Sequence, residues 1–318
     1  MLKKSSLLAL SLAVAACGGD PTVEAFKDGF PRTDTVALRV PGAAAESQPL
    51  TTDGVRRDGL EGDPAFFYGL TRAVTLTVNG TVVAALHLLE TITEHPPTTL
   101  SATSAVWGPY TDPLSPNTWR FTVTRRAVND YAYRLEGKGK TESDSAYRTI
   151  LSGTHVSGGR GFGNGSFTVD WTAAATLPEH DASVGTATFT YARPSATDPV
   201  VVDASLSQVH DGAQLVDATY RFRQVPGQGG AFEFQLDKDF GLGPALELLT
   251  VRSRWQETGA GRSDARLTGG DLPPAGGTAS ECWDSSFKSR WFAVSFDPLL
   301  TWGSPSACSF PTPEYAAP

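Results

Sequence analysis

Alternation of apolar and polar residues, which persists from about residue 98 to residue 255, constrains the fold of this chain more than any other feature. Successive side chains of a β-strand point to opposite faces of a sheet, so the pattern is typical of strands with one buried and one solvated face. Clusters of Gly, Pro, Asn and Asp separate the segments, as at 158–165, 194–199 and 226–230. The sequence therefore predicts an antiparallel meander of about nine to twelve strands. The apolar side of these strands includes Phe121, Tyr133, Phe167, Phe189, Phe222, Phe234 and Val251.

A chain with so many consecutive strands and one shared apolar face is expected to curl. We therefore predict a mainly β fold: a large curved antiparallel meander, either a barrel or a half-barrel, with one long helix packed on it. A transmembrane β-barrel, apolar outside and polar inside, is the alternative. The N-terminal signal described below, the long helix and the tail at 316–318, which lacks a terminal aromatic residue, argue against that alternative.

The long helix is predicted over about residues 64–95. Asp63 is a good N-cap in front of a proline, and Pro96-Pro97 would stop the helix. Asn79-Gly80 is instead a strong hairpin signal, so residues 72–83 could form a hairpin. We favour the helix because an apolar stripe recurs at three- or four-residue intervals along the whole segment. That stripe consists of Leu70, Val74, Val78, Val82, Leu86 and Leu89.

The first 16 residues have the three parts of a secretory signal. Lys3 and Lys4 precede an apolar run at 7–14, which is about half as long as a helix that crosses a bilayer. The residues that follow, Val14-Ala15-Ala16-Cys17, resemble the lipobox of bacterial lipoproteins. The resemblance implies cleavage before Cys17, acylation of that cysteine with chains such as palmitate, and stable attachment to a membrane.

Gly18, rather than an aspartate, follows the lipobox cysteine. An aspartate there tends to retain lipoproteins at the inner membrane, so the resemblance implies the outer membrane, facing the periplasm or the cell surface. Residues 17–62 are polar and rich in small residues, and we predict a tether and an irregular segment with a short strand at 35–40. Residues 63–318 are predicted to form a single β-rich domain.

With Cys17 lipidated, Cys282 and Cys308 are the remaining cysteines. In an oxidising envelope compartment we expect them to form a disulfide. Two free buried thiols are the alternative, and a redox pair is disfavoured because Cys-x-x-Cys spacing is absent. The disulfide would hold the C-terminal segment around residues 291–302 against the sheet.

Charge and motif content exclude several functions. The formal net charge is −8, and removal of residues 1–16 leaves 24 basic and 34 acidic residues, a net charge of −10. We therefore expect no nucleic acid partner, because no basic stripe would meet the phosphates. The five histidines lack metal-ligand spacing and Gly-x-Ser-x-Gly is absent, so the sequence predicts no metal site, no cofactor and no catalytic residue.

The general plan of a lipid anchor, a curved antiparallel sheet and a packed helix resembles half-barrel lipid carriers of the bacterial envelope. Trp107-Gly108-Pro109 and the run from Glu281 to Asp284 resemble uncharacterised bacterial lipoproteins, which supply no function. We expect a non-catalytic envelope lipoprotein that binds an apolar ligand or a protein partner, with a cavity between helix and sheet. A structural or surface lipoprotein with a fully packed core is the alternative.

Overall fold

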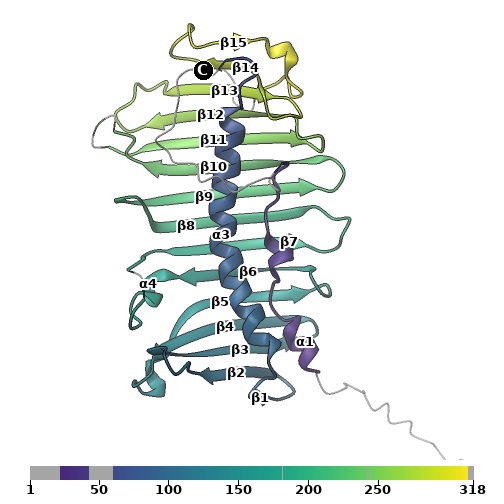
Figure 1. Cartoon of the computed structure of the whole chain (residues 1–318), viewed down its shortest axis with the longest axis vertical. Coiled ribbons are helices and arrows are strands. Elements are labelled where there is room, and N and C mark those ends of the chain that lie inside the picture. The colour runs from purple at the N-terminus through teal and green to yellow at the C-terminus, as the bar shows by residue number, and fades with distance from the viewer. Residues whose placement is uncertain (1–21, 43–59, 181, 242, 244, 314–318) are drawn as a thin grey trace, which may run out of the picture.

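One open antiparallel sheet forms the body of the protein (Figure 1). The computed structural model describes residues 22–42, 60–180, 182–241, 243 and 245–313. Within these residues fifteen strands follow one another in chain order, and β1 and β15 lie at opposite ends of the sheet. The mainly β class and the single long helix are therefore confirmed, whereas closure into a barrel is not observed.

The strands are β1 Thr99–Leu100, β2 Ser104–Tyr110, β3 Asn117–Ala127, β4 Asp130–Gly139, β5 Arg148–Ser157, β6 Gly163–Asp170, β7 Thr186–Arg193, β8 Val200–Asp211, β9 Gln214–Val225, β10 Gly229–Lys238, β11 Glu247–Gln256, β12 Gly261–Gly269, β13 Gly277–Trp283, β14 Ser289–Val294 and β15 Trp302–Gly303. The sequence predicted about nine to twelve strands, fewer than the fifteen observed. Short strands at both ends of the sheet, such as β1 and β15, are only two residues long and carry no alternation.

The long helix α3, Phe66–Glu94, crosses the strands on one face of the sheet (Figure 1). A helix of this length is about 44 Å long, roughly nine strand spacings of about 4.8 Å. By length and composition α3 could cross a bilayer, but here one side of it packs on the sheet. The hairpin alternative for residues 72–83 is therefore wrong. The reason is that the apolar stripe on α3 finds a continuous apolar surface to cover.

The predicted stripe is the buried side of α3. Leu86 and Leu89 are fully buried, Val78 and Val82 are nearly so, and Leu70 and Val74 are partly covered. Truncation of a leucine at such a position to alanine would cost about 2–5 kcal/mol of stability.

The N-terminus of α3 differs from the prediction, because Ala65 rather than Asp63 occupies the N-cap position and provides no side-chain cap. The buried carboxylate of Glu281 on β13 takes over this role. Its Oε2 atom accepts a hydrogen bond of 2.7 Å from the backbone N–H of Phe67. A negative charge is favourable at a helix N-terminus, so a residue more than 200 positions away completes the helix.

The tether prediction is wrong for residues 22–42, which pack beside α3 on the same face of the sheet (Figure 1). This segment contains two short helices, α1 Val23–Lys27 and α2 Thr33–Val36, so the strand expected at 35–40 does not form. Its few apolar side chains are deeply buried and hold the segment on the fold, although its composition is mostly polar. They are Phe26, Phe30, Val36, Leu38 and Val40.

Aromatic side chains fill the space between the sheet and the elements on its apolar face. Phe167 on β6 stacks on its cross-strand partner Phe189, with ring centroids 4.8 Å apart. Gly165 provides room for a neighbouring ring, because a Cβ atom there would lie 2.7 Å from the hydroxyl of Tyr191. The predicted core role of the strand aromatics is confirmed for these residues.

Three short helical segments lie in the connections and near the C-terminus. They are α4 Trp171–Ala174, the 3₁₀ turn η2 Asp144–Ala146 and the 3₁₀ turn η3 Pro305–Ala307.

Candidate functional site

A largely apolar pocket of about 510 Å³ lies at the C-terminal end of α3. It is bounded by the last turns of the helix and by strands β2 and β3. Its walls are formed by Leu88, Thr91, Ile92, His95, Pro96, Trp107, Tyr110, Trp119 and Phe121.

The helix contributes one side of its last two turns to the pocket. Leu88, Ile92 and His95 fall on that side because residues three and four positions apart share a helix face. Glu90 points the other way and accepts a hydrogen bond of 2.9 Å from the backbone N–H of Thr33. The N-terminal segment therefore covers one flank of α3, and the pocket lies on the opposite flank.

Trp107 joins the helix end to the sheet. Its indole N–H donates a hydrogen bond of 2.9 Å to the carbonyl oxygen of His95, one of the carbonyls that the end of the helix leaves without an intrahelical partner. The ring itself is fully buried and forms the floor of the pocket together with Phe121. The position of the helix end thus depends on a strand side chain.

An irregularity in β2 turns a further aromatic residue toward the pocket. Trp107 pairs with Phe121 and Tyr110 pairs with Trp119, so two residues of β2 oppose a single residue of β3 between these pairs. Gly108 has φ +107°, and a Cβ atom there would lie 2.6 Å from the carbonyl oxygen of Trp119. Only glycine fits such a position, which explains the Gly in the Trp-Gly-Pro run.

The lining contains no acidic residue, lysine or arginine. Leu88 and Tyr110 are 45% and 38% exposed, whereas Trp107 and Phe121 are fully buried, so the pocket has an open mouth and a closed floor. Such a surface can exclude water from a hydrocarbon chain or a ring, and it offers Thr91 and His95 for polar contacts.

The sequence predicted a cavity between the helix and the sheet without a position along the helix, and the pocket lies at the C-terminal end of α3. Ring stacking in the middle of the sheet, and the N-terminal segment beside α3, fill the space farther along the helix. Sequence reasoning placed Trp119 and Phe121 on the apolar side of their strand but did not identify the pocket. The one available signal was Trp107-Gly108-Pro109, which marks the irregular strand.

The histidines are dispersed. His87 is exposed on α3, His180 lies edge-on to Trp119 with centroids 6.1 Å apart, and His155 is buried with its Nδ1 atom 2.8 Å from the hydroxyl of Tyr191. Burial lowers the pKa of His155 to about 4. Among the described residues no group of three or more His, Cys, Asp or Glu side chains could hold a metal ion.

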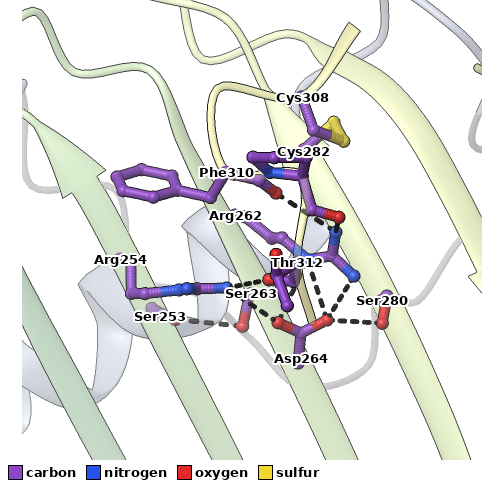
Figure 2. A network of polar contacts seen from close by, with 11 residues as sticks. Ser253, Arg254, Arg262, Ser263, Asp264, Ser280, Cys282, Cys308, Phe310 and Thr312 are labelled. Carbon is purple, nitrogen blue, oxygen red and sulfur yellow. Dashed lines mark hydrogen bonds and ion pairs between the residues drawn. A yellow bond between two sulfur atoms is a disulfide. The ribbon is translucent and has the colours of Figure 1, made fainter. Parts of the chain in front are cut away.

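Cys282 and Cys308 form a disulfide, with the sulfur atoms 2.11 Å apart. Figure 2 shows how it holds the C-terminal tail over the polar face of β11–β13. Arg262 is fixed by Asp264, to which its Nη2 atom donates a hydrogen bond of 2.8 Å, and by the carbonyl oxygen of Pro311. Cys17, the predicted lipidation site, lies outside the described residues.

Comparison of the chain with protein-family models, with curated proteins and with solved structures finds no significant match. The interpretation of the site therefore depends on its geometry.

Proposed function

We propose that the protein is a membrane-attached, non-catalytic lipoprotein that binds an apolar ligand, such as an acyl chain, in the pocket at the C-terminal end of α3. The observation that carries this proposal is the pocket itself, with nine lining residues and no charged side chain of the Asp, Glu, Lys or Arg type. Its volume of about 510 Å³ lies within the range typical of small-molecule sites.

The walls are suited to hold their shape when a ligand enters. Trp107 is hydrogen-bonded to the helix end, and Phe121 is packed edge-to-face on Phe30 with centroids 5.4 Å apart. Preformed apolar walls reduce the ordering cost of binding, so apolar contact area contributes more fully to affinity. An exposed Leu88 at the mouth would become buried by the ligand.

Two leucines on α3 allow a matched test. Leu88 lines the pocket and is 45% exposed, whereas Leu76 is 43% exposed and lies outside it. Complete burial of a leucine contributes about 1.5–3 kcal/mol, and a ligand would cover the 45% of Leu88 that is exposed, so Leu88→Gln should weaken binding of an environment-sensitive fatty-acid probe about three- to tenfold. Leu76→Gln should leave the affinity unchanged.

Native mass spectrometry provides a second measurement. A Cys17→Ser form purified without detergent should carry added mass that organic extraction removes. A clean apo mass together with no probe binding to the wild type would favour the alternative, a structural lipoprotein with no small-molecule site.

The outer-membrane localisation is a separate part of the proposal. The lipobox-like run that ends at Cys17 supports the anchor, and Gly18 after it supports the outer membrane. Acyl chains on this residue would attach the protein to the membrane without any membrane-binding surface on the fold. Cys17→Ser should therefore move the protein from the membrane fraction to the soluble envelope fraction. Failure of radiolabelled palmitate to enter the wild-type chain in a bacterial host would contradict the anchor.

A further inference from the structure

The face of the sheet opposite α3 carries rows of polar side chains that run across the strands. On β9, β10 and β11 two neighbouring rows differ in their central residue, which lies on β10. In the first row Glu233 lies between its cross-strand partners Arg221 and Arg252. In the second row Ala231 takes the central place between Arg223 and Arg254. The two rows thus have the same arginine flanks and differ in the residue between them.

In the first row the carboxylate meets both arginines. Arg252 Nε lies 2.6 Å from one oxygen of Glu233, and Arg221 Nη1 lies 3.8 Å from the other. Neighbouring strands are about 4.8 Å apart, so arginines two strands apart are separated by a space that one carboxylate fills. This row shows which chemical group suits the interval between two arginines on this face.

In the second row that interval is a groove. Ala231 has no side chain beyond Cβ, and a space of about 300 Å³ extends above it. Among the described residues, the salt bridges of this patch involve Arg221, Arg252 and Arg254, and none involves Arg223. The residues that line the groove are Val201, Asp203, Arg221, Phe222, Arg223, Ala231, Phe232, Glu233, Arg252, Ser253 and Arg254.

One wall of the groove is held firmly. Arg254 donates a hydrogen bond of 2.6 Å to the carbonyl oxygen of Thr312, and its guanidinium lies 5.1 Å from the ring centre of Phe310. It also lies 3.5 Å from Asp264. The disulfide-linked tail therefore fixes Arg254 from the side of β12 (Figure 2). Arg223 is exposed on the opposite wall.

We propose that the groove over Ala231 binds the oxyanion of a small ligand, a phosphate or a carboxylate group, between Arg223 and the neighbouring arginines. Four arginines against Asp203 and Glu233 give the groove a positive balance, although the chain as a whole has a net charge of −8. Guanidinium groups recognise such oxyanions through paired, charge-assisted hydrogen bonds. This site is separate from the apolar pocket, which lies on the other face of the sheet.

The first test uses inorganic phosphate and acetate as probes, each compared with chloride at equal ionic strength so that general screening is constant. Calorimetric titration, together with the ¹⁵Nε shifts of the arginine side chains, should show saturable binding to the wild type. Arg223→Gln should weaken it about tenfold or more. Arg134→Gln, which changes an exposed arginine on the same face at β4, should have no effect. The stronger of the two probes identifies the oxyanion.

A second variant introduces a carboxylate side chain at the centre of the second row, where the ligand is proposed to bind. Ala231→Glu should reproduce the arrangement of the first row, raise the midpoint of thermal unfolding at low salt and abolish binding of the probe. Three results would overturn the proposal: no binding beyond that of chloride, equal binding by Arg223→Gln and the wild type, or equal losses in Arg223→Gln and Arg134→Gln.

Discussion

Asn79 and Leu38 exchange two hydrogen bonds across the contact between α3 and the N-terminal segment. The side-chain Oδ1 of Asn79 accepts from the backbone N–H of Leu38, and its Nδ2 donates to the Leu38 carbonyl oxygen, each at 2.8 Å. The amide thus pairs with an extended backbone as a neighbouring strand would. It satisfies polar groups of a segment that would otherwise lie against an apolar helix.

Asn79→Ala should destabilise the protein by about 1–3 kcal/mol, because it leaves the partly buried N–H and C=O of Leu38 without these partners. Urea unfolding monitored by tryptophan fluorescence measures the loss. Thr77→Ala on the exposed side of α3 is the control and should change stability by no more than about 0.5 kcal/mol. Equal effects of the two substitutions would contradict the bridging role of Asn79.

The buried Glu281 should make stability depend on pH in an unusual direction. Burial raises its pKa above the ordinary value of 4.5, although hydrogen bonds from Phe67 and Ser289 oppose this. When the folded-state pKa of an acid is raised, the folded state holds the proton more tightly, so the contribution of that acid to stability falls as the pH rises above 4.5. The stability of the wild type relative to Glu281→Gln should therefore decrease between pH 4.5 and neutral pH.

Chemical unfolding of both proteins at several pH values checks this expectation, since other titrating groups cancel in the difference. Glu281→Ala is a useful second variant. It removes the acceptor for the Phe67 N–H and should cost about 1–3 kcal/mol near pH 4.5, a loss that becomes smaller toward neutral pH for the same reason as in Glu281→Gln. A difference between wild type and Glu281→Gln that stays constant with pH would argue against a raised pKa.

His155 should have the opposite pH dependence. Its pKa is lowered to about 4 from 6.5 by burial, so the folded state resists protonation. The resulting stability is fully present above pH 6.5 and is lost as the pH falls from 6.5 toward 4, by about 3 kcal/mol in total. The free energy of unfolding of His155→Gln should therefore fall less than that of the wild type as the pH decreases from 6.5 to 4. An NMR titration in which the His155 ring titrates near pH 6.5 would contradict this prediction.

The disulfide between Cys282 and Cys308 encloses a loop of 26 positions. On the chain-entropy model this cross-link contributes about 3.5 kcal/mol, and Cys308→Ala should lose up to that amount. Release of the tail should also expose Arg262, which is 2% exposed and bonded to the Phe310 carbonyl oxygen. Mass spectrometry after alkylation of the denatured, non-reduced protein should find neither cysteine modified. Alkylation of both would exclude the bond.

The spacing of apolar residues within single strands was sufficient to predict most of the sheet. Phe189 and Tyr191 are buried as the alternation of β7 predicts, while Thr188 and Thr190, on either side of Phe189, are exposed. The helix stripe around Leu86 was equally readable, because residues at three- and four-residue intervals share one face whatever they pack against. These features follow from backbone geometry within a single element.

The pocket could not be predicted in the same way. Its floor depends on the pairing of β2 with β3, and Tyr110 faces Trp119 only because Gly108 and Pro109 interrupt the regular register. The residue spacing within β2 does not indicate which residues of β3 lie opposite it. The Trp-Gly-Pro run indicated an irregular strand but did not indicate that the irregularity brings Tyr110 to a pocket.

The sequence by itself determined the alternating strands, the long helix and the identity of the apolar faces. Tertiary structure decided that Phe26 and Phe30 are core residues rather than parts of a tether, and that Glu281 completes the N-terminus of α3. The physical reason is that side-chain periodicity depends on covalent geometry between near neighbours, whereas the partner of a buried face or an open helix end is chosen by the free energy of packing between distant segments.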